Sequence, residues 1–328
     1  MKLIKHPVLC NYYVTYRCNA SCSFCDIWER PSPYVSTDTV FKNLKDLKKL
    51  GVKVIDFTGG EPLLHRQIDQ LLRMAREAGF ITTLTTNTLL YPKWANRLKG
   101  LVNMLHFSLD SSNKERHDQS RGIACYDTLI ESIAIAKSIG ERPDILFTAG
   151  KDSVYELEEV YRKISLPNNL ILIINPLFEY NTKGTLDKLD KQSVMYLKRQ
   201  WTRKKNVYLN QAFLDLRLEG GNNIYDPVCK AASSTIVISP ENKLVLPCYH
   251  LGKQEFDIED NLFSLYNSTR VKALINQEGR LPECAGCVIN CYMQPSFAVN
   301  MNRYWFKALP STIKYNFIKG TWRHLSLT

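Results

Sequence analysis

The chain contains 328 residues with a mass of 37.8 kDa, 45% hydrophobic and 23% charged residues, and a net charge of +11. This composition is typical of a globular protein, and the length allows one large domain or two smaller ones. The sequence has no apolar run of the ~18–20 residues that span a bilayer and no signal peptide, so we expect a cytoplasmic protein. The positive charge suits an anionic partner, but no DNA- or RNA-binding pattern is present, and nucleic acid is a minor candidate.

Apolar, β-branched runs alternate with helical patterns up to about residue 178. Ser36 is expected to cap a helix with apolar positions on one face, which ends at Gly51. The alternation predicts βαβ units and a parallel sheet of about six units, a partial (β/α)6 barrel. The expected strands are 10–16, 52–57, 80–86, 101–110, 144–150 and 170–178, and further helices are expected at about 65–78, in the stretch up to 140, and at about 154–164.

The C-terminal half has a different pattern. A polar helix is expected at about 188–205, followed by a hairpin in residues 234–250 with its turn at 240–243. The predicted division is a barrel (1–182), a linker (183–224), a small hairpin and helix domain (225–295) and a basic, aromatic tail (296–328).

Polar stretches follow each of the first four predicted strands. A cysteine-rich loop follows the first strand, and the sequences TGGEP, TTNT and SLDSS follow the next three. Because the carboxyl ends of parallel strands meet at one edge, we expect all four stretches to lie on the same rim, where such folds place their reactive sites.

Eight of the ten cysteines form two groups, and the first group is Cys18, Cys22 and Cys25. Three thiolates do not complete the four ligands of a structural zinc site, whereas a [4Fe–4S] cluster held by three cysteines leaves one iron open. The spacing alone leaves an iron–sulfur cluster, zinc and chance clustering as alternatives. Cys10 and Cys125 stand apart and are expected to be small buried hydrophobic residues.

The C-x3-C-x2-C spacing, with Phe24 before the third cysteine and Gly59-Gly60-Glu61-Pro62 after the next strand, resembles the radical S-adenosylmethionine (radical SAM) superfamily over about residues 8–180. The resemblance implies that the three cysteines ligate three irons of a [4Fe–4S] cluster and that SAM chelates the fourth. It also implies that one electron, from a donor such as flavodoxin or ferredoxin, cleaves SAM to methionine and a 5′-deoxyadenosyl radical. That radical then abstracts hydrogen from a substrate carbon, or in some members adds to the substrate.

The same resemblance implies residues that bind SAM. Gly59 and Gly60 would leave backbone groups accessible to its amine, with Glu61 as an acceptor and Phe24 near the adenine. The other implied contacts are Pro62, Asn87, Ser108 and Asp110, the last two at the ribose, and Arg121 at the carboxylate. One departure is Thr88, where many members carry glycine, and it weakens the assignment of Asn87. The simpler interpretation of these residues is a loop hydrogen bond or a helix cap.

The second cysteine group comprises Cys229, Cys248, Cys284, Cys287 and Cys291, and it suits either zinc or another iron–sulfur cluster. By spacing alone the two are equally supported. Behind a radical SAM barrel, the pattern resembles the auxiliary-cluster domain called SPASM, or its shorter twitch version, and five cysteines imply one auxiliary [4Fe–4S] cluster. The expected ligands are Cys229, Cys248, Cys284 and Cys287, with Cys291 as a competitor for one of these places.

The substrate stays open between a peptide and a small molecule, with a lipid modified at a membrane, or a non-enzymatic cluster- or zinc-binding module, as alternatives. Residues 284–328 contain no acidic residue but interleave aromatic residues with Arg303, Lys307, Lys314, Lys319 and Arg323. This pattern suits peripheral contact with an anionic membrane. The other interpretation is a tail that packs across the barrel with its cations in solvent.

Overall fold

One mixed sheet forms the centre of the computed structural model, which describes residues 3–178, 189–259 and 261–320. In the order β10-β9-β8-β1-β2-β3-β4-β5-β6-β7, the strands from β8 to β7 are parallel, while β9 is antiparallel to both β8 and β10. Their bounds are β1 Leu9–Thr15, β2 Val54–Gly59, β3 Ile81–Thr86, β4 Met104–Ser108, β5 Asp144–Ala149, β6 Leu172–Pro176, β7 Val207–Tyr208, β8 Thr235–Ile238, β9 Lys243–Leu246 and β10 Gln254–Asp257.

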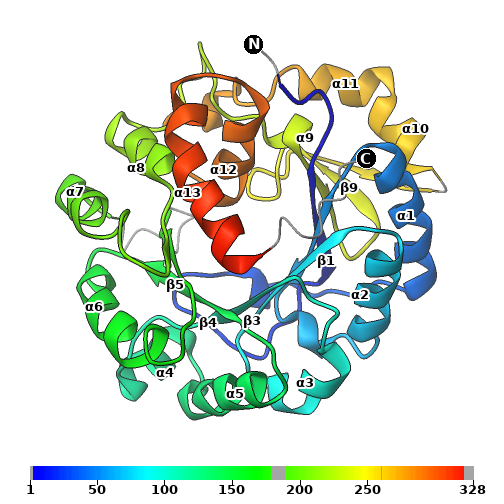
Figure 1. Ribbon diagram of the computed structural model, residues 1–328. Coiled ribbons are helices and arrows are strands. Elements are labelled where there is room, and N and C mark those ends of the chain that lie inside the picture. The colour runs from blue at the N-terminus through cyan, green and yellow to red at the C-terminus, as the bar shows by residue number, and fades with distance from the viewer. Residues whose placement is uncertain (1–2, 179–188, 260, 321–328) are drawn as a thin grey trace.

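Helices surround the curved sheet on its outer side, while α12 and α13 lie in front of the ring of strands (Figure 1). The architecture confirms the predicted α/β partial barrel. The helix bounds are α1 Thr37–Lys49, α2 Ile68–Glu77, α3 Tyr91–Leu98, α4 Lys114–Arg121, α5 Tyr126–Ser138, α6 Leu157–Val160, α7 Lys191–Gln200, α8 Gln211–Leu218, α9 Ala231–Ser234, α10 Leu262–Asn267, α11 Thr269–Ile275, α12 Asn290–Val299 and α13 Arg303–Lys319.

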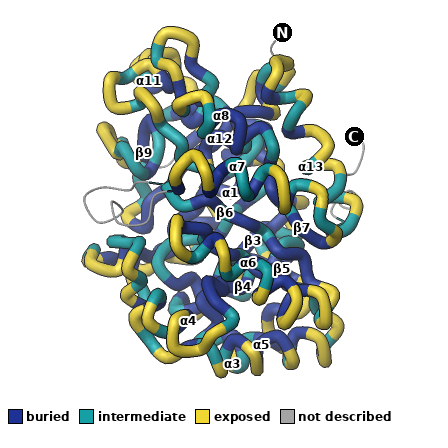
Figure 2. Tube along the Cα trace, turned by 90° about the vertical axis from the view of Figure 1, so that its left-hand side faces the viewer, coloured by how far each residue is buried: buried dark blue, intermediate teal, exposed yellow. Residues whose placement is uncertain are grey.

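The larger hydrophobic core lies between the sheet and its outer helices, and a smaller one packs around α8, α12 and α13. In β2, Ile55 and Phe57 are fully buried, while the alternate residues Val54 and Asp56 are only partly buried. The same alternation recurs in β4, β5 and β6. Because successive side chains of a strand point to opposite faces, the outward face packs on the helices and the inward face stays partly accessible. Figure 2 shows the buried trace running through the middle of the molecule.

Helix α12 spans the gap between the two ends of the parallel part of the sheet. Gln294 accepts a hydrogen bond from the Tyr208 hydroxyl of β7 at 2.6 Å, and Tyr292 accepts one from the backbone N–H of Tyr249, just after β9, at 2.9 Å. The backbone carbonyl of Val299 accepts from Leu3, shortly before β1, at 2.8 Å. The lateral opening of the partial barrel is thus covered by a helix.

Several predicted elements differ in extent. Ser36 caps α1 as expected, accepting from the N–H of Thr39 at 3.1 Å, but the helix expected at 154–164 is a 3-10 turn, the short α6 and a π-helical turn at Tyr161–Ser165. The helix expected at 188–205 is only α7, and residue 188 lies outside the described residues. The hairpin is confirmed, and β8 pairs in parallel with β1, so that it continues the barrel sheet. The domain boundaries stay a prediction.

The tail helix α13 packs on α8, α12 and β7. Its cations pair with acids of the barrel: Lys307 with Asp215 at 2.6 Å and Lys319 with the fully buried Asp144 at 2.9 Å. Lys307 keeps a side chain that is 41% exposed, so the expectation that a packed tail keeps its cations in solvent is wrong only for the buried Lys319. Arg323 lies outside the described part of the chain. Within that part, no helix combines the length and the hydropathy needed to cross a membrane.

Candidate functional site

The loop that carries Cys18, Cys22 and Cys25 follows β1 and rests on the end of α4. The N–H groups of Ser21 and Ser23 donate to the carbonyls of Arg121 and Ser120, both at 3.1 Å. A Cβ on Gly122 would lie 2.3 Å from the Ser21 hydroxyl, so glycine is required for this close approach. The loop is thereby fixed to an element about 100 residues later in the sequence.

The three cysteines are free thiols of intermediate exposure at the carboxyl ends of the strands. Burial is the main cause that raises the pKa of Cys18 to about 12 and that of Cys25 to about 11. A metal centre binds thiolates, so its binding must displace these protons. A guanidinium nitrogen of Arg121 lies 3.8 Å from the Cys22 sulfur. Unpaired cysteines gathered beside a cation suit an iron–sulfur cluster.

Gly59 and Gly60 bring the end of β2 against the start of this loop. A Cβ on Gly59 would lie 2.0 Å from the carbonyl oxygen of Thr15, and one on Gly60 would lie 2.1 Å from that of Arg17. The N–H of Gly60 donates to Thr15 and that of Glu61 to Arg17, both at 2.9 Å. The two glycines therefore have a packing role at the base of the cysteine loop, and their predicted contact with SAM stays a prediction.

Glu61 ties three segments together from a position that is 1% exposed. One carboxylate oxygen accepts from the Thr86 hydroxyl at 2.8 Å and the N–H of Leu63 at 3.0 Å, and the other from the N–H of Asn87 at 2.8 Å. Burial raises the pKa of Glu61 to about 7, although these hydrogen bonds oppose the shift. Pro62 is buried in the following 3-10 turn.

Asn87 joins the end of β3 to the cysteine loop. Its side-chain amide donates to the side-chain carbonyl of Asn19 at 2.7 Å. The next residue, Thr88, is fully buried with φ at 71°, a backbone conformation that glycine adopts more readily. The position where the sequence departs from the family pattern is thus one whose conformation favours glycine.

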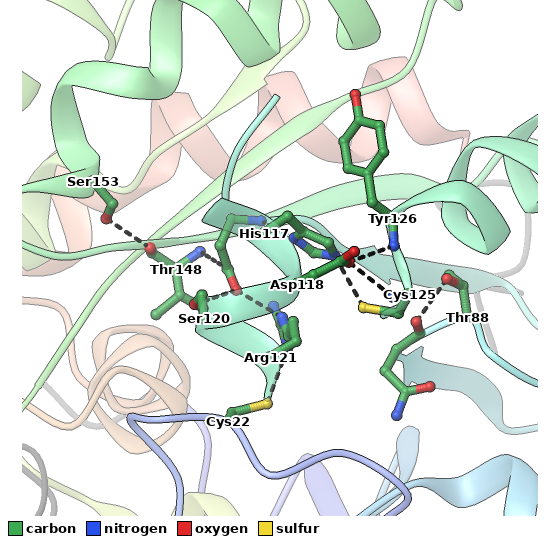
Figure 3. Close-up of polar contacts among 12 residues, drawn as sticks. Cys22, Thr88, His117, Asp118, Ser120, Arg121, Cys125, Tyr126, Thr148 and Ser153 are labelled. Atoms are coloured by element: carbon green, nitrogen blue, oxygen red, sulfur yellow. Dashed lines mark hydrogen bonds and ion pairs between the residues drawn. The ribbon is translucent and has the colours of Figure 1, made fainter. Parts of the chain in front are cut away.

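Arg121 and Asp110 form a buried ion pair. Arg121 lies beside Cys22 (Figure 3). The guanidinium Nε lies 2.7 Å from the carboxylate, whose other oxygen accepts from the N–H of Thr148 at 3.2 Å. Burial is the largest effect and lowers the pKa of the Arg121 guanidinium, but Asp110 and the nearby thiols together outweigh it and raise the pKa. The guanidinium also lies 5.4 Å from the ring centroid of Phe24. The structure thus brings together Phe24, Asp110 and Arg121, three of the predicted SAM contacts. Ser108, another predicted contact, is buried at the end of β4, two residues before Asp110.

Two residues that the sequence did not single out as site residues support this ion pair. The backbone N–H of Asp110 donates to His117 Nδ1 at 3.2 Å, which leaves the proton on Nε2, 3.3 Å from the sulfur of Cys125. Burial and then Arg121 lower the pKa of His117 to about 4, so the imidazole is neutral. Cys125 is buried as expected, but its hydrogen bond had no signal in the sequence. Cys10 is buried in the core, as predicted.

The second cysteine group lies around its own cavity of about 180 Å³, lined by Cys229, Cys248, Cys284 and Cys287. Burial raises the pKa of each of these thiols. Cys291 does not line this cavity; it lies in the barrel interior with its sulfur 3.6 Å from His250 Nε2. The four expected ligands are therefore together and the competitor is separate.

A further cavity of about 240 Å³ lies between the two cysteine groups. It is lined by Phe24, Cys25 and Gly59 on one side and by Tyr249 and His250, which follow Cys248, on the other. Its remaining lining comes from inward residues near the carboxyl ends of strands, including Tyr13, Thr58, Thr148 and Asn175. The cavity therefore borders Cys25 of the first group and the residues that follow Cys248 of the second.

Comparison with known proteins gives one family match and several relatives. Residues 12–164 match the model of the radical SAM superfamily. A probable GTP 3′,8-cyclase of Sulfurisphaera tokodaii is 25% identical over 265 residues, 76% of this chain and 83% of that protein. An AdoMet-dependent heme synthase of Methanosarcina barkeri is 26% identical over 193 residues, which are 57% of this chain and 54% of the relative.

The fold is also that of solved structures. SuiB of Streptococcus suis bound to S-adenosylmethionine superposes with a TM-score of 0.68 at 18% identity, over 83% of this chain and 68% of that chain. The structure of anSMEcpe with bound AdoMet superposes with a TM-score of 0.64 at 17% identity, over 98% of this chain and 97% of the other. At these identities the likeness is one of fold.

Proposed function

The chain belongs to the radical SAM superfamily of enzymes, and on this premise we propose that Cys18, Cys22 and Cys25 hold a [4Fe–4S] cluster whose fourth iron binds SAM. The observation that carries the proposal is the meeting of the three cysteines, the glycine pair and Arg121 at one mouth of the barrel. When bound, the cluster supplies the electron that cleaves SAM to methionine and a 5′-deoxyadenosyl radical, which removes hydrogen from a substrate carbon.

The protein's own residues would position SAM and exclude water. Phe24 offers a ring face at the cavity, and Arg121, held by Asp110, offers a cation to the methionyl carboxylate. Glu61 and Asn87 fix the β2 and β3 ends against the cysteine loop, and this rigidity would preserve the site through each reaction cycle.

We further propose one auxiliary [4Fe–4S] cluster on Cys229, Cys248, Cys284 and Cys287. Their shared cavity supports this ligand set, whereas Cys291 lines a different cavity. The auxiliary cluster would assist electron transfer or substrate binding, with a flavodoxin or ferredoxin as external donor. A peptide or small molecule would occupy the cavity between the groups; SuiB and anSMEcpe, which share the fold, have been solved with peptides.

Iron content and SAM cleavage test these proposals separately. Anaerobically reconstituted protein should contain about eight iron and eight sulfide, and about four of each when Cys18, Cys22 and Cys25 are replaced by alanine. Cys291→Ser is the matched control and should keep the wild-type content. With dithionite and SAM, the wild type should release 5′-deoxyadenosine, and Cys22→Ala should release none. A wild-type iron content near four together with stoichiometric zinc would reject the auxiliary cluster.

A further inference from the structure

The interior of the barrel contains a second cavity below the proposed reaction site. It has a volume of about 430 Å³, within the range of about 300–1,000 Å³ that ligand pockets usually have. The barrel contributes inward residues from the first halves of its strands, among them Leu9, Val54, Met104, Leu146 and Ile173. We refer to this cavity as the lower lumen. In a closed (β/α)8 barrel, packed side chains fill this space, whereas here the inward residues remain partly exposed.

The lower lumen is adjacent to the cavity beside Cys25. Asp56 lines the lower lumen, and Thr58, two residues along the same strand, lines the upper cavity. Leu146 and Thr148 of β5 repeat this relation. Two residues along a strand span about 6.6 Å. In β1, Leu9 lines the lower lumen and Tyr13 the upper cavity, and the four residue steps between these positions span about 13 Å. The two cavities therefore lie one above the other along the barrel.

The contact between His250 and Cys291 confirms that the cavities are adjacent. His250 lines the upper cavity and Cys291 the lower one, with 3.6 Å between the imidazole nitrogen and the sulfur. Asn175 of the upper cavity likewise accepts a hydrogen bond from Asn290 of the lower lumen. Only side chains, and no backbone layer, separate the two spaces at these points.

Several polar side chains of the lower lumen are held in hydrogen bonds. Thr83 donates to Asp56 at 2.6 Å, and Tyr315 donates to Asp144 at 2.7 Å. Gln294 accepts from Tyr208, as described above, and donates to Asn290 at 2.5 Å. Burial raises the pKa of Asp56, which favours its uncharged form. The surface left to a ligand is therefore mostly hydrocarbon, from the aliphatic strand residues with Val8 and Pro295.

From this geometry we propose that the substrate is a small amphiphile whose aliphatic chain lies in the lower lumen, while the carbon that loses hydrogen lies in the upper cavity beside Cys25. The mostly hydrocarbon lining favours an aliphatic chain over a polar group, because burial of each methylene stabilises binding. The inference rests on the proposed function, because that function places the reactive end.

Fluorescence of cis-parinaric acid, an unbranched polyene fatty acid, provides the test. The purified full-length protein should bind the probe saturably, and palmitate should displace it. Leu146→Trp and Val54→Trp each fill the lower lumen and should weaken binding by about tenfold or more, since several methylene contacts are lost. Ile130→Trp, on the exposed side of α5, is the matched control. Phe317→Ser, at an exposed apolar position of α13, should also leave binding unchanged if the probe occupies the lumen.

Two results would overturn the inference: no saturable binding by the wild type, or unchanged binding in both lumen variants when circular dichroism shows that they are folded. SAM cleavage measured on the same preparations separates this test from that of the proposed function. Probe binding without SAM cleavage would support the lumen as a chain-binding site and reject the proposed function. SAM cleavage without probe binding would reject the inference alone.

Discussion

Removal of one partner of the buried ion pair between Arg121 and Asp110 should destabilise the protein strongly even without a cluster. Their side chains are only 9% and 5% exposed, and the two charges lie 2.7 Å apart. Removal of one partner leaves the other charge buried and unpaired, which typically costs about 3–5 kcal/mol. We therefore expect Arg121→Gln and Asp110→Asn each to lower the free energy of unfolding by about that amount, and the double variant to lose clearly less than the sum.

Urea denaturation of the cluster-free protein, followed by circular dichroism at pH 7 under reducing conditions, measures these changes. The exposed pair of Lys114 and Asp127 offers a matched control on neighbouring elements, and Lys114→Gln should leave the midpoint nearly unchanged. The reasoning fails if either single variant of the buried pair stays within about 1 kcal/mol of the wild type, the range of a surface pair. It also fails if the two losses add without coupling.

Three further predictions concern the strand ends around the site. Gly60→Ala places a Cβ 2.1 Å from the Arg17 carbonyl, so the reconstituted variant should lose the iron of the first cluster while Gly100→Ala, with open space, keeps it. The pKa of Glu61 is raised to about 7, so its stabilising effect is complete below about pH 4.5 and lost as the pH rises through 7; urea midpoints from pH 5 to 8 should fall less in Glu61→Gln than in the wild type. Thr88→Gly relieves left-handed strain of about 1 kcal/mol and should therefore destabilise the protein less than Thr88→Val, as thermal melts can show.

The parallel sheet was predictable because each strand has its own apolar run next to a helical pattern. Where the prediction failed, local signals were weak or the determining contacts were distant. Strand β7 has only two residues and owes its place to pairing with β6. The turn at Tyr161–Ser165 has its two apolar residues at helical spacing, and nothing local indicates its π geometry. The pairing of Leu9 with Thr235 links segments whose sequences give no indication of each other.

At the candidate site, too, features set by local sequence were predictable and features set by distant contacts were not. The short spacing of Cys18, Cys22 and Cys25 predicted that these thiols share one loop, and the four expected ligands of the second group line one cavity. The contact between His117 and Cys125 was not predictable, since each residue is isolated and its role depends on the orientation of α4. Arg121 and Asp110 were each predicted from the resemblance to contact SAM, but only the structure shows that they contact each other.

The position of β1 in the sheet has a consequence for the order in which the chain acquires structure during synthesis. Its partner β2 emerges from the ribosome within about 50 residues, whereas its other partner, β8, begins at Thr235. Until then one edge of β1, including the residues that lead into the cysteine loop, has unpaired N–H and C=O groups. The nascent chain therefore carries an open strand edge through the synthesis of six further strands, and folding should be most prone to aggregation, and most dependent on chaperones, in that interval.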